Sequence, residues 1–254
     1  MTPDFGLTAG DYARHRAGFP ASFFAGIEDF GVGRRGQTLV DLGTGTGTLA
    51  RGFARRGCRV IALDPSAPML EQARALDAAE GLTVDYRLGR AEETGLDAAS
   101  AEVVTAGQCW HWFDRPRAAA EARRILEPGG ALMMAHFDWL SIPGNVVHET
   151  ETLILSYSPD WRGARMAAPY NAWYFDLRAA GFTGIESFTF ERDVVYTHEA
   201  WRGRIRASAG VGASLSPEKV AEFDAKHAAL LSRAFAVDPM NVPHRCWAVW
   251  GRKP

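Results

Sequence analysis

The chain contains 254 residues, and its 28 Lys and Arg against 30 Asp and Glu leave a formal net charge of −2. With 47% hydrophobic and 23% charged residues it has the composition of a globular protein, which excludes disorder as its main feature. No stretch reaches the roughly 18 uninterrupted apolar residues of a membrane span, and Asp4, Asp11, Arg14 and Arg16 stand where a signal peptide would be apolar. We therefore expect a soluble, cytoplasmic protein built as one domain with an insertion.

The cysteines and the charge distribution limit the possible partners. Cys58, Cys109 and Cys246 are far apart and lack both CxxC and Cys/His ligand spacing, so neither a disulfide framework nor a metal site is predicted. The balanced charge, without a long basic run, argues against a nucleic-acid partner. We expect a small-molecule substrate, no membrane contact, and a monomer or a homodimer.

Residues 1–37 precede the first predicted strand and should form two helices, around Ala9–Arg16 and Pro20–Phe30. Residues 38–136 then alternate strand-length apolar runs with helix-like segments, which is typical of a parallel sheet covered on both faces. The predicted strands are Thr38–Leu42, Arg59–Leu63, Leu82–Arg87, Val103–Ala106 and Ala131–His136. The predicted helices between them are Thr48–Arg56, Ala67–Ala79 and Arg117–Leu126. The sequence Glu-Pro-Gly-Gly at 127–130 is interpreted as a helix stop followed by a tight turn.

The composition changes after His136, because residues 137–182 are rich in Trp, Pro, Gly and Asn, which indicates an insertion. Short helices are predicted within it at Val147–Ser156 and Asn171–Ala180. The last predicted elements are a strand at Ile185–Tyr196, helices at Glu199–Ser208 and Pro217–Ala234, and a strand at Arg245–Trp250. We expect residues 137–254 to complete the same domain as residues 38–136.

The most informative stretch is residues 39–50, where an apolar strand runs through Gly43, Gly45 and Gly47 directly into a helix. Glycines there permit positive φ and let a ligand approach the backbone, while the free N–H groups of the new helix favour an electron-rich group. Asp64 ends the next strand, where a carboxylate can accept both ribose hydroxyls of an adenosine. The pattern predicts a site for a nucleoside cofactor.

Two cofactors fit a strand, a glycine turn and a distal acid, and the details separate them. In a GxGxxG pattern starting at Gly43, the third glycine position is Thr48, which lacks the small side chain that dinucleotide binders need there. Asp41, two residues before Gly43, suits a positively charged cofactor such as S-adenosylmethionine. An NAD site is the less favoured alternative.

Four motifs in order, DLGTGTG (41–47), ALDPS (62–66), GRAEETGL (89–96) and LEPGG (126–130), resemble class I S-adenosylmethionine-dependent methyltransferases. The segment Tyr-Ala-Arg-His-Arg at 12–16, with Phe19 and Pro20, resembles the segment that folds over the cofactor in the small-molecule, trans-aconitate methyltransferase-like branch. This resemblance implies that Tyr12 and Arg16 contact the cofactor carboxylate or an acidic substrate. The resemblance implies an α/β, Rossmann-like seven-stranded sheet, five strands parallel with a C-terminal antiparallel pair, helices on both faces and a helical cap insertion. It also implies that residues 38–136 bind S-adenosyl-L-methionine, with S-adenosyl-L-homocysteine as product, and that residues 1–37 lie over the cofactor site.

Carried over position by position, the resemblance implies contacts to the methionine end, the ribose and the adenine of the cofactor. The glycine loop and Asp41 would hold the methionine end, Asp64 the ribose, and Ala91 and Glu92 the adenine edge. Gln108 stands where relatives usually place a backbone carbonyl near the cofactor ammonium. Many relatives carry an acidic residue at this position, and this chain does not. The full implied cofactor set is Tyr12, Arg16, Asp41, Gly43, Thr44, Gly45, Asp64, Pro65, Ser66, Met69, Ala91, Glu92, Gln108 and Trp110.

Residues 108–114, Gln-Cys-Trp-His-Trp-Phe-Asp, follow the fourth predicted strand at the edge of the sheet where ligands bind. Trp110 and Trp112 offer aromatic faces to a sulfonium and to an apolar acceptor. His111 is the only side chain of the stretch that titrates near neutral pH, which makes it the candidate general base. The open alternative is that the stretch only anchors the loop.

Candidate acceptor contacts come from the aromatic stretch and the C-terminal part, namely Trp112, Arg204 and His244. Arg202 and Arg206 are four residues apart and share one helix face, whereas Arg204 points elsewhere, and an arginine facing a cleft can clamp a carboxylate. Solvated helix charge is the alternative for Arg204, and a turn residue is the alternative for His244.

Taken together, these observations predict transfer of a methyl group to a small organic acceptor, preferably to oxygen. Two other functions stay open at this point. One is a regulator that binds S-adenosylmethionine without turnover. The other is an NAD-dependent oxidoreductase, which Thr48 and the LEPGG motif disfavour.

Overall fold

The computed structural model describes residues 17–166 and 169–254. Contacts divide the chain into two compact units. The core unit contains residues 18–137, 169–190 and 246–254, and the helical unit contains the described residues of 138–166 and 191–245 together with Ala17. The helix expected at Ala9–Arg16 lies outside the described residues.

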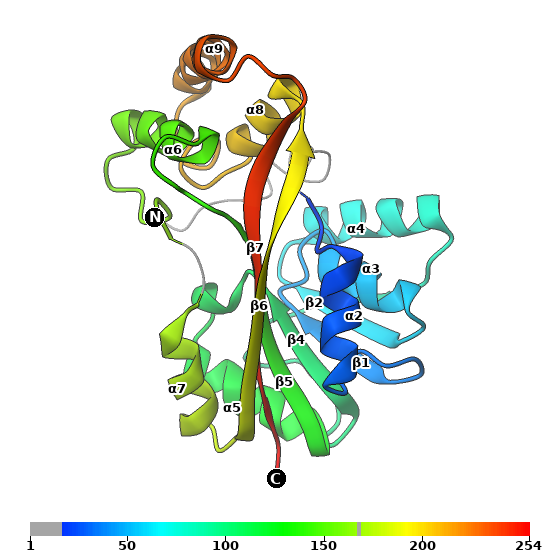
Figure 1. The fold of residues 1–254 in the computed structure, drawn as a ribbon. Coiled ribbons are helices and arrows are strands. Elements are labelled where there is room, and N and C mark those ends of the chain that lie inside the picture. Colours follow the sequence, from blue (N-terminus) through cyan, green and yellow to red (C-terminus); the bar gives the residue numbers. More distant parts are fainter. Residues whose placement is uncertain (1–16, 167–168) are drawn as a thin grey trace. The chain divides into compact units, whose positions relative to one another are not determined.

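The seven strands form one sheet in the order β3-β2-β1-β4-β5-β7-β6 (Figure 1). Their bounds are β1 Thr38–Leu42, β2 Arg59–Asp64, β3 Asp85–Leu88, β4 Ala101–Gly107, β5 Leu126–Trp139, β6 Thr183–Tyr196 and β7 Met240–Arg252. The first five strands pair in parallel, with Leu39 of β1 opposite Val60 of β2 and Val103 of β4, and the last two form the antiparallel C-terminal pair. The predicted fold class is confirmed.

Helices cover both faces of the sheet in the core unit (Figure 1). Helices α2 (Ala21–Asp29), α3 (Thr48–Arg55) and α4 (Ala67–Glu80) lie on one face, and α5 (Arg115–Ile125) and α7 (Asn171–Ala179) lie side by side on the other. The side chain of Asp114 accepts the N–H of Arg117 at the start of α5, and α4 ends at Gly81 with φ +67°. These are the local signals that set helix boundaries.

The interpretation of residues 127–130 as a tight turn is wrong. Strand β5 begins directly at Leu126 and runs through Pro128 and both glycines. The reason is tertiary, because the backbone of Lys253 pairs with Gly129 and Gly130 through N–H···O bonds of 2.8 and 2.9 Å. Gly129 takes φ +79°, so the strand bulges where a turn was expected.

The helical unit packs α6 (Val146–Tyr157), α8 (His198–Arg206) and α9 (Pro217–Ala234) around one apolar cluster. Trp201, Ile205 and Phe223 form its centre and have no exposed surface. The side chain of Thr197 caps α8 by accepting the N–H of Ala200. Among the described helices, none is both long and apolar enough to cross a bilayer.

Candidate functional site

The three glycines after β1 serve different purposes. A side chain at Gly43 would meet the sulfur of Cys109 at 2.9 Å, and one at Gly47 would meet the hydroxyl of Tyr86 at 2.2 Å. Gly45 has φ +56°, and a Cβ there would have nothing within 4 Å. Close packing therefore requires the outer glycines, while Gly45 leaves its backbone open to a ligand.

Asp64, the last residue of β2, is tied to this loop. Its Oδ2 accepts the backbone N–H of Gly45 at 2.8 Å, and its Oδ1 accepts that of Ser66 at 2.9 Å. Burial raises the pKa of this carboxyl, and the two backbone donors counter the shift. Each carboxylate oxygen has a second lone pair, so the group can accept two further hydroxyl donors such as those of a ribose.

Asp41 lies beneath the loop and keeps only 1% of its surface exposed. Its Oδ1 accepts the hydroxyl of Thr105 on the neighbouring strand β4 at 2.6 Å. Burial raises the pKa of Asp41 to about 6, and the hydrogen bond from Thr105 opposes the shift. The hydrogen bond with Thr105 holds the Asp41 side chain between β1 and β4, next to the glycine loop. Asp41 would therefore influence a ligand through its charge and by positioning the loop.

The residues expected around an adenine lie at the ends of β2 and β3. Pro65 is exposed, Ser66 is partly exposed, and Met69 is 4% exposed in the first turn of α4. Ala91 is buried, and Oε1 of Glu92 accepts the backbone N–H of Asp114 at 2.9 Å. Glu92 therefore ties its own segment to the start of α5.

Thr44 and Gln108 hold backbone turns at the same edge of the sheet. Thr44 donates its N–H to the carbonyl of Leu63 at 2.9 Å, which joins the loop to β2. Gln108 is one of few non-glycine residues with positive φ, at +60°, and its N–H donates to the carbonyl of Ala135 on β5 at 2.9 Å. Such a strained conformation persists where the surrounding structure enforces it.

The aromatic stretch after β4 divides into a buried anchor and an exposed part. Trp110 begins the short helix η2 (Trp110–Trp112), is fully buried, and donates its indole N–H to Oδ2 of Asp176 at 3.0 Å. His111 is exposed, and Trp112 keeps 47% of its surface exposed. The contacts of Trp110 are those of a loop anchor, while His111 and Trp112 are accessible to a ligand.

Sequence reasoning missed His136, which lies on β5 beside the aromatic stretch. Its ring centroid lies 6.0 Å from that of His111, 4.4 Å from Tyr170 and 4.8 Å from Trp173. It is 4% exposed and bordered by the stacked pair of Tyr170 and Trp173. Its place as the last residue of a predicted parallel strand was the available signal, since ligands bind at that edge.

The other two residues predicted to contact the acceptor, Arg204 and His244, belong to the helical unit. Tyr12 and Arg16, which were predicted to contact the cofactor, lie outside the described residues. Arg204 lies over the ring of Trp139 at 4.7 Å, while Arg202 and Arg206 share a helix face as predicted. His244 is 3% exposed, its Nδ1 is 2.8 Å from the carbonyl of Val242, and burial lowers its pKa to about 4.

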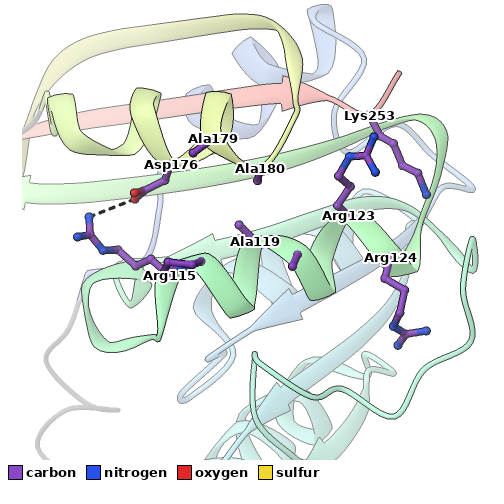
Figure 2. Close-up of a pocket in the computed structure, with 10 residues that line it drawn as sticks. Arg115, Ala119, Arg123, Arg124, Asp176, Ala179, Ala180 and Lys253 are labelled. Carbon is purple, nitrogen blue, oxygen red and sulfur yellow. Dashed lines mark hydrogen bonds and ion pairs between the residues drawn. The ribbon is translucent and has the colours of Figure 1, made fainter.

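A cavity of about 590 Å³ lies elsewhere in the core unit, between α5 and α7. Figure 2 shows the ion pair of Arg115 with Asp176 at one end of the cavity. The side chains of Arg123 and Lys253 lie at the other end, and alanines line the space between. None of the glycine-loop residues lines it. The open backbone of Gly45 and the carboxylate of Asp64 lie at the glycine loop and not at this cavity.

Residues 40–134 match the family model described as "Methyltransferase domain". The sheet order, the glycine loop and the acid at the end of β2 agree with the class I, S-adenosylmethionine-dependent methyltransferase fold that the sequence resembles. Among the described residues, no group of three or more His, Cys, Asp or Glu side chains could hold a metal ion.

The chain is similar to an uncharacterized methyltransferase of Mycobacterium tuberculosis, at 39% identity over 132 residues, 52% of this chain and 51% of that protein. It is also similar to a malonyl-acyl carrier protein O-methyltransferase of Brevibacillus brevis, at 29% identity over 194 residues, 72% and 67% of the two chains. The match therefore spans about half the length of the mycobacterial relative.

A solved structure with the same fold is phosphoethanolamine N-methyltransferase 2 of Haemonchus contortus in complex with S-adenosylhomocysteine. It superposes with a TM-score of 0.58 at 19% identity, covering 98% of this chain and 58% of that chain. At this identity the likeness concerns the fold alone.

Proposed function

We propose that the whole chain transfers a methyl group from S-adenosylmethionine to an oxygen of a small organic acceptor. The observation that carries the proposal is the pairing of the open backbone at Gly45 with the carboxylate of Asp64 at 2.8 Å. This pair offers hydroxyl acceptors next to a surface that no side chain covers, which suits the ribose of a nucleoside cofactor. The family of residues 40–134 supports the same cofactor.

The residues of the core unit fit this cofactor in charge as well as in shape. S-adenosylmethionine, when bound, supplies a methyl group on a positively charged sulfur. Asp41 and Asp64 are two carboxylates beside the glycine loop, and Trp112, in the segment after β4, keeps 47% of its surface exposed and can offer its ring to a sulfonium. The likeness to a malonyl-acyl carrier protein O-methyltransferase supports an oxygen acceptor.

For the acceptor, the chain has to provide orientation and, for a hydroxyl group, a proton acceptor. Alignment of the reacting atoms is the larger contribution in a direct displacement. An imidazole nitrogen of the exposed His111 takes the hydroxyl proton in this proposal, while the aromatic residues around His136 exclude water. A carboxylate acceptor needs no base, because its oxygen already carries the charge.

Calorimetric titration of the purified full chain with S-adenosylmethionine, S-adenosylhomocysteine and NADH tests the proposal. We expect saturable binding of the first two and none of NADH. Binding of NADH alone would replace the proposal with an oxidoreductase. Binding of S-adenosylmethionine without methyl transfer to any member of a panel of acids and phenols would favour a regulator.

A further inference from the structure

The three arginines of α8 have different environments. Arg202 and Arg206 both bind Asp224 of α9, with Nε of Arg202 at 3.0 Å and Nη1 of Arg206 at 2.8 Å from Oδ1. Glu199 pairs with the same two guanidinium groups at 3.1 and 3.0 Å. The charges of Arg202 and Arg206 are therefore compensated within the helical unit.

Arg204 projects from another face of α8 and has no such partner. Among residues 17–166 and 169–254, no carboxylate lies within 4 Å of its guanidinium, and no oxygen accepts a hydrogen bond from it. The guanidinium carbon of Arg204 lies over the ring of Trp139, 4.7 Å from the ring centroid. Asp138 and Tyr196 attract the charge electrostatically.

Burial of this guanidinium is costly without an anion. Burial lowers the pKa of Arg204, which means that the surroundings disfavour its charged form. A buried charge is normally paired, and an unpaired one is tolerated where a ligand supplies the missing charge. Arg204 keeps part of its surface accessible, so an anion can reach it.

The contact with the ring of Trp139 leaves the N–H donors of the Arg204 guanidinium available to a planar anion. A ring contact uses one face of the guanidinium, whereas its N–H donors lie in the plane and stay available at the edge. A carboxylate matches two of these donors in a bidentate pair, which adds geometric specificity. The aromatic rings of Trp139 and Tyr196, which both pack near Trp201, suit a carboxylate with an apolar body.

Among the described residues, the titratable groups next to Arg204 do not supply a second positive charge. His244 stacks near Tyr196 with centroids 6.1 Å apart, and burial lowers its pKa to about 4, so it is neutral at pH 7. The charge of Arg204 itself contributes to this shift. Asp138 attracts this charge but forms no ion pair with it, so Arg204 is the cation that the described residues of this region offer to an anionic ligand.

We propose that Arg204 binds the carboxylate of a small acidic ligand in the helical unit. The assignment of this ligand as the methyl acceptor rests on the proposed function. Trp139, whose ring lies against Arg204, belongs to the same unit. The substrate class is therefore small carboxylic acids with an apolar or aromatic body.

The test uses the full chain labelled with ¹⁵N-arginine and follows the arginine Nε–H resonances by NMR during titration with phenylacetate, glutarate and phenylacetamide. The Arg204 resonance is assigned with Arg204→Lys. We expect a saturable shift with at least one carboxylate and none with the amide. Arg204→Gln should weaken carboxylate binding roughly 10- to 100-fold, as for a lost charge-assisted hydrogen bond.

Arg202→Gln is the matched control, since it removes the same charge from the same helix at a compensated position. It should leave carboxylate affinity within a few-fold, and circular dichroism checks that each variant is folded. If Arg204→Gln does not fold, Arg204→Lys keeps the charge, loses the planar fork, and should bind the carboxylate more weakly than wild type.

Equal shifts with acid and amide, no saturable shift with either acid, or unchanged affinity in Arg204→Gln would overturn the proposal. S-adenosylmethionine affinity is measured on the same samples. If the cofactor binds and the carboxylates do not, only this inference fails. If carboxylates bind at Arg204 and the cofactor does not bind, the site stands and the proposed function fails.

Discussion

The carboxylate of Asp64 accepts the backbone N–H of Gly45 at 2.8 Å, across 19 residues of sequence. This bond joins the end of β2 to the middle of the glycine loop, so the acid that would bind a ribose also fixes the loop beside it. Ligand contact and loop geometry therefore depend on the same side chain.

Asp64→Asn should weaken binding of S-adenosylmethionine and S-adenosylhomocysteine by about tenfold or more. An amide keeps one acceptor oxygen and places an NH₂ against a backbone donor, so at least one hydrogen bond of about 0.5–1.5 kcal/mol is lost, and more where charge assists. Calorimetry measures the affinity, and the exposed Asp85→Asn is the control. Unchanged affinity in Asp64→Asn would exclude the ribose assignment.

Two glycine substitutions should separate ligand binding from packing. Gly47→Ala places a methyl 2.2 Å from the hydroxyl of Tyr86 and should lower the melting temperature, because both the clash and the positive φ cost free energy. Gly45→Ala meets no atom within 4 Å, so its stability cost is the backbone strain alone, about 1–2 kcal/mol. Its main effect should be loss of cofactor affinity. The reverse order of the two melting temperatures would contradict this account.

His111→Ala should lower turnover of a hydroxyl acceptor by about 10²-fold or more while leaving cofactor affinity nearly unchanged, as expected for loss of a general base. A carboxylate acceptor should be much less affected, since it needs no deprotonation. Steady-state methyl transfer with paired phenol and acid acceptors provides the measurement. Full turnover of the phenol by the variant would assign His111 to loop structure.

Asp41 should make stability depend on pH in a defined direction. Its pKa rises from 3.8 to about 6 on folding because of burial. The folded state therefore favours the protonated form, and the contribution of Asp41 to stability is present below pH 4 and lost as the pH rises through 6. Relative to Asp41→Asn, wild type should lose up to about 3 kcal/mol between pH 4 and 7.

Urea unfolding of both proteins at several pH values measures this difference, and the comparison cancels other titrating groups. The amide of Asp41→Asn keeps an oxygen that can accept the Thr105 hydroxyl and does not titrate, so the slope of the difference is the diagnostic quantity. If the difference in unfolding free energy between wild type and Asp41→Asn stays constant from pH 4 to 7, burial does not raise the pKa of Asp41.

Asp176→Ala should destabilise the protein by about 1–3 kcal/mol, because it leaves the indole N–H of fully buried Trp110 without its acceptor. Arg115→Ala removes the other partner of Asp176, yet its side chain is 40% exposed, so its effect should be within about 1 kcal/mol. Thermal unfolding measures both. Equal losses would assign the effect to the ion pair.

The alternating strands and helices, the glycine loop and the position of Asp64 could all be predicted from the amino-acid sequence. These features follow from local rules: apolar periodicity, glycine conformations, and the constraint that parallel strands end at one edge of a sheet. The start of α8 was predictable in the same way, because Thr197 caps its own helix.

Which of these candidate residues anchor a loop and which are accessible to a ligand depends on contacts between segments far apart in the chain. The burial of Trp110 depends on Asp176, 66 residues away, and residues 127–130 became a strand because Lys253 pairs with them. Arg202 and Arg204 are two residues apart, and Asp224 of a later helix compensates only the first. Local pattern specifies an element, but long-range neighbours set the burial and pairing of each side chain, and those determine its chemistry.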